Sequence, residues 1–331
     1  MKWPEPPLVT RVEHVRTISS PLDLDPRSTE SVWDRFVHFL LGTRKTVRTL
    51  AHPMDVEVSP DGGTVYVSDF AQGIVHVFDL VEGVARYVGD GRLARPFGLA
   101  LDSKGNLYIA EQAKRQIRVV NPDGETLQIV QSDQLIRPAD IELDEKRGRL
   151  YVADPSRQRS SDHFVRVFDL DGNYLGEIGQ GRGLGDGKLL FPTYLALDPD
   201  GTLYVSDTMN GRVSVFNAEG NFVRTVGERG DGFGQFDKPK GVALDSFGNL
   251  YVVDSSWANV QIFGPESDVL LYFGGRGGYP GFLRNPTGIA VAREQNTIYV
   301  GDYLNHRIGV YRLVNTGPGD GLSSQNTGGT P

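Results

Sequence analysis

Short apolar segments recur along the chain, and turn-forming residues separate them. In residues 212–216 apolar and polar side chains alternate, the pattern of a β-strand with one buried face. Residues 250–253 are apolar throughout, as expected of a strand buried on both faces. Turns such as residues 102–106 supply the Asp, Gly and Asn that tight turns favour. The pattern predicts many short strands and an all-β fold.

One phrase recurs six times: a proline, a short apolar strand, a turn, and a second apolar strand that contains a tyrosine and ends in an acid. Its members are Pro53, Pro96, Pro138, Pro192, Pro239 and Pro286; Tyr66, Tyr108, Tyr151, Tyr204, Tyr251 and Tyr299; Asp69, Glu111, Asp154, Asp207, Asp254 and Asp302. Consecutive prolines are 42 to 54 residues apart. A period of about 40–50 residues with several strands per unit is typical of propeller blades. We therefore expect a six-bladed β-propeller whose antiparallel blades each have four strands, a to d.

The ends of the chain predict how the ring closes. The sixth repeat has strands a, b and c, and then runs into the polar, Gly-rich residues 315–331, which we expect to be disordered. Residues 11–19 resemble a strand d, so they are expected to complete the last blade and hide its edge. The predicted organisation is a Pro-rich segment at 1–10, a propeller at 11–314, and the tail.

One helix is predicted in the first connection between strands d and a, at about residues 27–41. Asp25 and Pro26 suit an N-cap followed by proline, and Gly42 suits the residue after the helix end. Apolar residues at helical spacing form one stripe. In propellers the b–c turns and d–a connections share one face, here called the top face, so the helix should lie on or beside it. Its stripe could pack on the propeller, or contact a membrane or partner.

Charge and composition exclude several classes of function. Acidic residues outnumber basic ones, 42 to 34, which argues against a nucleic-acid partner. The absence of cysteine rules out disulfides, thiol nucleophiles, zinc–thiolate sites and iron–sulfur clusters. No apolar run approaches the ~18 residues of a membrane helix. The first residues lack the apolar core of a signal peptide, but a leader or lipid anchor removed before Met1 would still allow membrane anchoring.

The most specific motif is an acid followed by Asn-x-Arg, in residues 301–308 and 206–213. With these motifs the repeats resemble the NHL family of six-bladed β-propellers, over roughly residues 45–314. The third repeat departs, because Pro155 follows its acid and no Asn-x-Arg is present. In this family the acid after strand b has a structural role in capping the b–c turn.

The chain is also similar to uncharacterised bacterial NHL-repeat proteins that have a Trp-Pro-rich start and a Trp-containing helix before the first blade. Those proteins resemble exported proteins and are often lipid-anchored. The resemblance implies an extracytoplasmic location, periplasmic or at the cell surface. It leaves a cytoplasmic location open.

The inner strands carry the candidate chemistry, since the channel is the usual ligand site of a propeller. Two positions of the inner strand, two and four residues after the repeated proline, are acidic in blades one and three. The other blades have mostly small residues there. These acids are Asp55, Glu57, Asp140 and Glu142. They could hold Ca²⁺, share protons, or lie inert in a wet channel. Tyr194 and Lys240 are candidate partners for them. Arg95 and Arg137 could neutralise them instead.

The resemblance raises three further activities. Amidating lyases of the propeller class use a histidine cluster with zinc, but only His52 of six histidines stands at the start of an inner strand. Gluconolactonase- and paraoxonase-like propellers use Ca²⁺ with Asp, Glu and Asn around the pore, which the four carboxylates permit. RNA-binding members present a basic top face, whereas acids alternate with basic residues here.

We expect a non-catalytic scaffold that binds a protein or peptide through the top face and channel. The third repeat has an insertion around residues 156–163, and a polar loop on a rigid scaffold is often functional. The candidate binding residues are His52, Phe70, Arg157, Arg159, His163, Tyr194, Lys240, Trp257 and Tyr303. No oligomer is implied. The alternative is a hydrolase or lyase at the pore mouth that depends on Ca²⁺ or zinc, with Asp55, Glu57, Asp140 and Glu142 as ligands.

Overall fold

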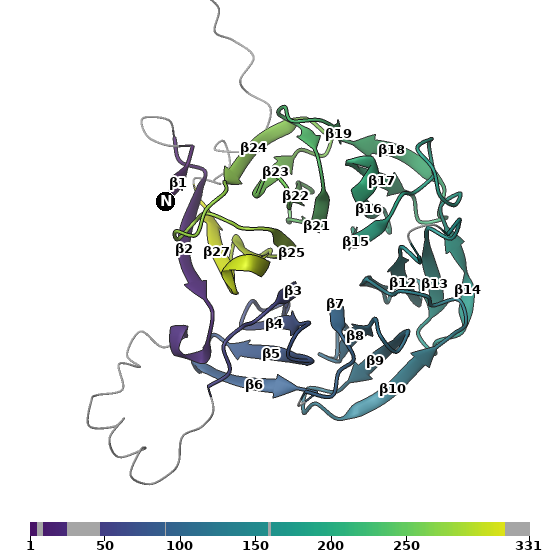
Figure 1. Ribbon diagram of the computed structural model, residues 1–331, viewed down its shortest axis with the longest axis horizontal. Helices are drawn as coiled ribbons and strands as arrows, with labels where there is room; N and C mark the ends of the chain where they lie inside the picture. Colours follow the sequence, from purple (N-terminus) through teal and green to yellow (C-terminus); the bar gives the residue numbers. More distant parts are fainter. Residues whose placement is uncertain (5–8, 25–46, 90, 158–159, 315–331) are drawn as a thin grey trace, which may run out of the picture.

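The strands form radial sheets around a central channel, with strand a of each blade nearest the axis (Figure 1). The computed structural model describes residues 1–4, 9–24, 47–89, 91–157 and 160–314. The six-bladed all-β propeller predicted from the repeat is confirmed. The helix expected at about 27–41 and the tail at 315–331 lie outside the described residues.

The blades follow the repeat, each from the channel outward. Blades one and two contain β3 (Pro53–Val58), β4 (Thr64–Asp69), β5 (Ile74–Asp79) and β6 (Val84–Val88), then β7 (Pro96–Leu101), β8 (Leu107–Glu111), β9 (Gln116–Val120) and β10 (Thr126–Gln131). Blades three and four contain β11 (Asp140–Asp144), β12 (Arg149–Asp154), β13 (Phe164–Asp169) and β14 (Tyr174–Ile178), then β15 (Pro192–Leu197), β16 (Leu203–Asp207), β17 (Arg212–Phe216) and β18 (Phe222–Val226).

Blade five contains β21 (Pro239–Leu244), β22 (Leu250–Asp254), β23 (Asn259–Phe263) and β24 (Val269–Gly274). Blade six contains β25 (Pro286–Ala292), β26 (Thr297–Asp302) and β27 (Arg307–Leu313). A short parallel pair, β19 (Glu228–Arg229) and β20 (Gln235–Phe236), lies in the connection between blades four and five. The 3-10 turns are η1 (Pro21–Asp23), η2 (Thr208–Asn210) and η3 (Tyr303–Asn305).

Burial explains the apolar pattern of the strands. The second strands, such as β8 and β22, are buried at every position because neighbouring blades cover both of their faces. The outermost strands, such as β6, alternate between exposed and covered residues because one face meets solvent. The hydrophobic core is therefore divided into clusters between adjacent blades, for example the one that joins β15 to β21 and β22.

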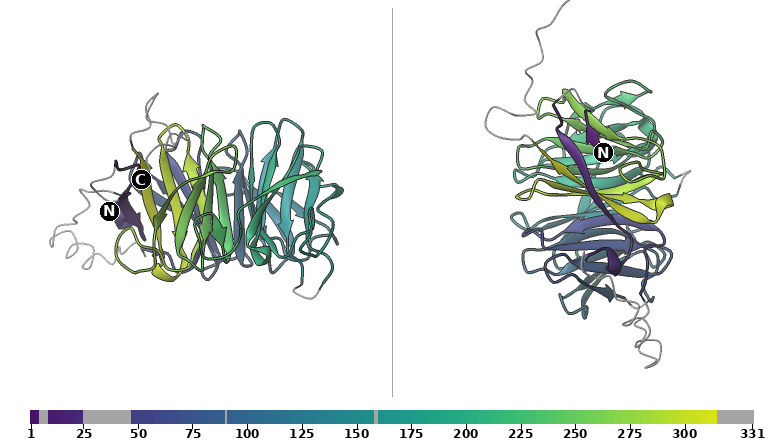
Figure 2. Two further views of the ribbon diagram at one scale, coloured as in Figure 1. Left: turned by 90° about the horizontal axis from the view of Figure 1, so that it is seen from above. Right: turned by 90° about the vertical axis from the view of Figure 1, so that its left-hand side faces the viewer.

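The N-terminus closes the ring as the sequence predicts. Strand β2 (Val12–Ile18) pairs antiparallel with β27 and becomes the fourth strand of blade six (Figure 2). Strand β1 (Lys2–Trp3) then adds a fifth strand, which the Pro-rich sequence did not suggest. The Trp3 indole is buried against Phe273 and Tyr311, with ring centroids 5.9 Å from each. No helix among the described residues is long and apolar enough to cross a membrane.

Candidate functional site

The acids at the ends of the second strands stabilise the turns and connections of the blades. Their side chains are fully buried. Asp69, for example, accepts backbone N–H groups of Ala51 and His52 in the d–a connection, and of Ala71 in the b–c turn. Asp254, the corresponding acid of blade five, likewise accepts backbone N–H groups from its d–a connection and from its b–c turn. Asp69 and Asp254 therefore cap the b–c turn, as the family resemblance implies, and also fix the d–a connection. At the b–c turn, Asp207 and Asp302 instead accept from an asparagine and an arginine side chain of their own blades.

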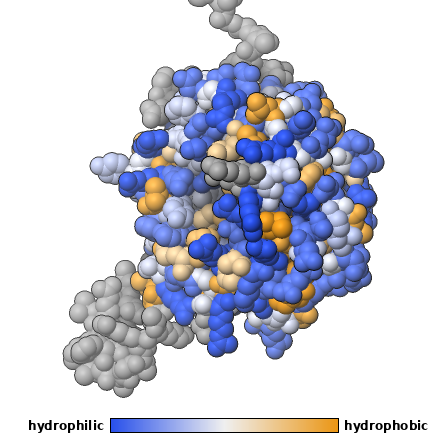
Figure 3. Space-filling model, turned by 45° about the vertical axis from the view of Figure 1, so that its right-hand side comes forward, coloured by the Kyte–Doolittle hydropathy of each residue, from blue (hydrophilic) through white to orange (hydrophobic). Residues whose placement is uncertain are grey.

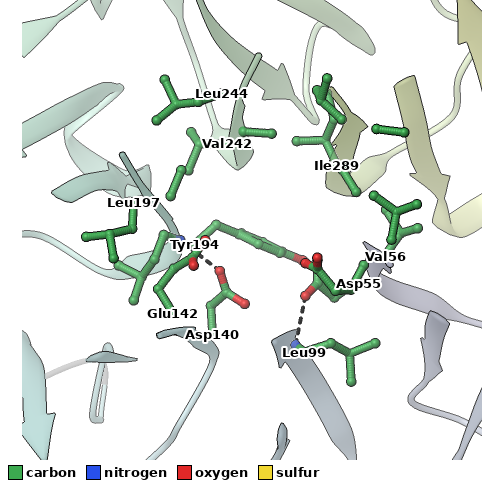
Figure 4. Close-up of a pocket in the computed structure, with 18 of the residues that line it drawn as sticks. Asp55, Val56, Leu99, Asp140, Glu142, Tyr194, Leu197, Val242, Leu244 and Ile289 are labelled. Atoms are coloured by element: carbon green, nitrogen blue, oxygen red, sulfur yellow. Dashed lines mark hydrogen bonds between the residues drawn. The ribbon is translucent and has the colours of Figure 1, made fainter. Parts of the chain in front are cut away.

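The channel contains a cavity of about 380 Å³ that the inner strands line (Figure 4). All four carboxylates singled out from the sequence reach it. Its lining continues to the a–b turns, where Pro60, Arg293 and Glu294 are exposed. The cavity therefore opens on the face opposite the b–c turns, here called the bottom face.

Asp55 and Asp140 connect neighbouring blades. Both are buried, and each accepts a backbone N–H of the next inner strand: Leu99 N to Asp55 Oδ2 at 2.9 Å, and Leu195 N to Asp140 Oδ2 at 2.8 Å. On its other side each carboxylate lies over a glycine, Gly288 or Gly98, where a Cβ atom would overlap it. The alternation of Asp and Gly at this position therefore lets each aspartate span three consecutive blades.

The two aspartates also interact with each other. Burial raises the pKa of Asp55, and the Leu99 N–H opposes this shift. Burial, followed by the charge of Asp55, raises the pKa of Asp140 well above its usual range. The two carboxyl groups therefore affect each other's ionisation. Neighbouring like charges disfavour double ionisation, so burial and this repulsion together favour a protonated form of the pair.

Tyr194 crosses the channel at the level of this pair (Figure 4). Its hydroxyl donates to the Met54 carbonyl at 2.7 Å and so links blade four to blade one on the opposite side of the ring. The side chain is buried, and burial raises its pKa well above the usual value. The cavity therefore extends from Tyr194 towards the bottom face, and the predicted partnership of Tyr194 is with a backbone carbonyl.

Glu57 and Glu142 are half-buried and face the cavity. Burial, with a further contribution from Asp55, raises the pKa of Glu57 to about 8. Burial and the charge of Glu57 raise the pKa of Glu142 well above its usual range. Arg293, the residue after β25, opposes both shifts. The sequence reasoning missed Arg293, although an inner strand longer than the others was a signal for it.

The other expected cations lie elsewhere. Lys240 Nζ is 3.4 Å from Asn285 Oδ1 and does not line the cavity, and burial lowers its pKa to about 8. Arg95 lies over the ring of Phe70, at 5.5 Å from its centroid. Arg137 lies over the ring of Phe191 in the same manner. The acids are therefore compensated by protonation, backbone N–H groups and Arg293.

The arrangement does not suit a bound metal ion. Within the part of the chain that the structure describes, no three His, Asp or Glu side chains converge closely enough to hold one. Asp55 and Asp140 already use carboxylate oxygens on backbone N–H groups. Ca²⁺ requires six to eight oxygen ligands. The geometry therefore favours backbone hydrogen bonds of these carboxyl groups over a cation site.

The remaining candidate residues are distributed over the top face. His52 stacks on Tyr303 with ring centroids 4.6 Å apart. His163 is buried, and its Nδ1 accepts the Phe191 N–H at 2.9 Å. Arg157 is exposed in the long b–c connection of blade three, and Arg159 lies outside the described residues. Trp257 is exposed in the b–c turn of blade five.

A second candidate site lies on the top face of blades four to six. Each of these blades exposes one large apolar residue from its d–a connection and one from its b–c turn. The pairs are Leu184 and Met209, Phe233 and Trp257, and Tyr279 and Leu304. We call these six residues the apolar row. Figure 3, an oblique view of the molecule, shows a largely hydrophilic surface with separate apolar patches. Of these six residues, the sequence analysis identified only Trp257. A single large apolar residue within each Gly-rich connection was the feature that could have indicated the others there.

Comparison with known proteins agrees with the fold. A family model described as SMP-30/Gluconolactonase/LRE-like region matches residues 43–156. A model described as 6-bladed beta-propeller matches 193–267, and the NHL repeat matches 283–311. The peptidyl-glycine alpha-amidating monooxygenase A of Xenopus laevis is 28% identical over 157 residues, which are 43% of this chain but only 16% of that protein.

Solved structures with the same fold are more distant in sequence. A gluconolactonase from Xanthomonas campestris is 19% identical, with a TM-score of 0.62 over 80% of this chain and 87% of that one. A virginiamycin B lyase from Staphylococcus aureus, solved with quinupristin, is 14% identical, with a TM-score of 0.57 over 80% and 95%. A chain of a nidogen/laminin complex is 21% identical, with a TM-score of 0.55 over 70% and 85%. At these identities the likeness concerns the fold alone.

Proposed function

Because the chain is an NHL-repeat six-bladed β-propeller, we propose that it is a non-catalytic scaffold that binds a protein or peptide on its top face. The observation that carries this proposal is the apolar row on blades four to six. Exposed large apolar side chains are normally scattered singly, whereas here six of them share one face of three successive blades. Aromatic residues on a rigid frame are also the usual centres of binding energy.

The channel supports the same conclusion. The two buried aspartates of the channel, Asp55 and Asp140, accept backbone N–H groups of the next blade. Tyr194 crosses the channel and closes the path towards the top face. A carboxyl group that already bonds to the next blade cannot also bind a substrate without losing that bond and destabilising the propeller. The similar fold in a nidogen/laminin complex agrees with a binding role for propellers of this shape.

The experiment compares captured proteins from native extract, by quantitative mass spectrometry, for three forms of the chain. The first is the unchanged chain, and the second is the double variant Phe233→Ala/Tyr279→Ala. The third is Phe247→Ala, which removes an equally exposed aromatic residue from an a–b turn on the bottom face. We expect a partner that the unchanged chain and Phe247→Ala retain and the double variant loses. Equal capture by all three forms would remove the apolar row from the interface.

A second candidate function, a hydrolase or lyase, is favoured by one observation. The cavity combines two acids of raised pKa, Glu57 and Glu142, with Arg293. Titratable groups with shifted pKa values in a cavity are typical of active sites. A screen of lactones and esters tests it: turnover that Glu142→Gln abolishes, but the double variant of the apolar row retains, would support the enzyme.

A further inference from the structure

The Gly-rich connections of blades four and six are each fixed by the arginine that begins strand c. In blade four, Arg212 donates from Nε to Asp207 Oδ2 at 3.0 Å, and from Nη2 to the carbonyls of Gly185 and Lys188, both at 2.9 Å. In blade six, Arg307 donates from Nε to Asp302 Oδ2 at 3.2 Å, and from Nη2 to two carbonyls of its own connection. A guanidinium group therefore fills the space between turn and connection in both blades.

Blade five has Asn259 at this position, five residues after its acid Asp254. The connection is still held, because Trp257 Nε1 donates to the Gly230 carbonyl at 3.3 Å. Asn210 in blade four makes the corresponding bond to Gly183. Gln261 Nε2 donates to the Gln235 carbonyl at 2.8 Å. The Gln235 carbonyl lies four residues before the strand-a proline, as do the Lys188 and Phe282 carbonyls that the arginines reach, so Gln261 makes this bond in blade five. An open space remains beside it.

The open space is a groove of about 380 Å³ between β23, β24 and the β19–β20 connection, at the blade labelled β21 to β24 in Figure 1. Asp231, Phe233, Trp257, Asn259 and Tyr272 contribute to its lining. Phe233 and Tyr272 meet edge to face, with ring centroids 5.4 Å apart. The groove therefore presents aromatic surfaces and one carboxylate together.

An orphaned acceptor points to what the groove binds. Asn259 Oδ1 is buried without a hydrogen-bond partner. A buried acceptor left in this state is costly, so its natural complement is an N–H donor. Aromatic faces attract a cation, and a carboxylate adds an opposite charge. A planar guanidinium meets all three requirements at once, because it stacks on rings and donates in a fixed fork, which an ammonium group does not.

We propose that the groove of blade five is a receptor for an arginine side chain of the partner, beside the position where blades four and six carry Arg212 and Arg307. This inference rests on the proposed binding function and specifies the partner's chemistry: a segment that presents an exposed arginine. The net charge of −8 favours such a basic partner.

The test follows the indole N–H resonance of Trp257 by NMR, assigned with the Trp257→Phe variant, during titration with N-acetyl-arginine amide. N-acetyl-lysine amide and N-acetyl-norleucine amide serve as matched probes. We expect a saturable shift at millimolar arginine amide, about tenfold weaker binding of the lysine probe, and no shift with norleucine. Equal responses to the three probes would overturn the proposal.

Two variants tie the response to the groove. Asn259→Arg restores the arrangement of the neighbouring blades, so it should abolish the arginine response and raise the melting temperature. Asp231→Asn should weaken binding several-fold without a change in fold, whereas Asp186→Asn in the connection of blade four should not. Retained binding in both groove variants would contradict the assignment. Partner capture that depends on the apolar row, together with no arginine response, would overturn this inference alone. An arginine response without any captured partner would instead count against the proposed function.

Discussion

The channel and the top face of blades four to six are built from the same repeat but use their polar groups in opposite ways. In the channel, Asp55 and Asp140 are buried and bound to the backbone of the next blade. On the top face, Asn259 Oδ1 has no partner, and large apolar side chains meet solvent. The channel acids that stand out in the sequence therefore stabilise the propeller. The proposed binding site lies instead on blade five, where Asn259 stands in place of the arginine of blades four and six.

The largest expected effect tests the role of the channel aspartates as connections between blades. Gly98→Ala would place a Cβ atom 2.7 Å from the Ala139 carbonyl oxygen and in overlap with Asp140. Because the backbone of blade three would have to shift, we expect a loss of about 3 kcal/mol, or about 4 °C in melting temperature. Thermal unfolding followed by circular dichroism measures it. Gly185→Ala, with no atom near the new methyl group, is the control and should change little. Equal effects would mean that the aspartates do not require these glycines.

The next effect contrasts blade six with blade five. Arg307→Asn would remove donors from the fully buried Asp302 and from the connection, so we expect a loss of about 2 kcal/mol. Asn259→Ala removes only an amide whose oxygen is already unpaired, and should change stability by less than about 0.5 kcal/mol. Urea or thermal unfolding of the two variants gives both numbers. A large loss for Asn259→Ala would show that the groove is part of the frame.

The fold was predictable because its signal repeats along the chain. The same phrase of proline, tyrosine and acid located every blade, and the two-residue period of a strand placed all four carboxylates in the channel. Residues 11–19 were recognisable as the closing strand by their likeness to other fourth strands. The β1 strand was not, because Trp3 is held by packing on Phe273 and Tyr311, which only the closed ring brings near.

The partners of the site residues were not predictable in the same way. Tyr194 bonds to a carbonyl 140 residues away on the opposite blade, a pairing that the ring geometry decides. Arg293 reaches the cavity from the position directly after β25. The missing arginine of blade five is visible in the sequence at Asn259. However, the groove that it leaves depends on where Phe233 and Tyr272 lie, and no local pattern specifies their positions.

The pH dependence of stability tests the protonated state of the channel acids. Burial raises the pKa of Glu57 to about 8 in the folded chain, from an ordinary value of about 4.5. Between these values the folded state keeps a proton that the unfolded state releases, so its contribution to stability falls as the pH rises from about 5 to 8. Glu57→Gln should therefore stabilise the chain at about pH 8 by roughly 1 kcal/mol, less than the full shift implies because channel water screens the half-buried carboxyl. Melting curves across this range, with the exposed Glu82→Gln as control, measure the difference. A variant that follows the same pH profile as the unchanged chain would mean that Glu57 is ionised in the fold.

The smallest expected effect concerns calcium. If Asp55 and Asp140 are committed to backbone N–H groups and a protonated form of the pair, a few millimolar Ca²⁺ should move the melting temperature by less than about 1 °C, because a ligand that does not bind the folded state does not stabilise it. The same measurement on Asp55→Asn/Asp140→Asn separates the possible origins of any larger shift. An increase of several degrees in the unchanged chain that the double variant loses would make the channel a calcium site, and the contrast with the top face would fail. An increase that both chains share would come from acids elsewhere on the surface, and the channel aspartates would keep their place as connections between blades.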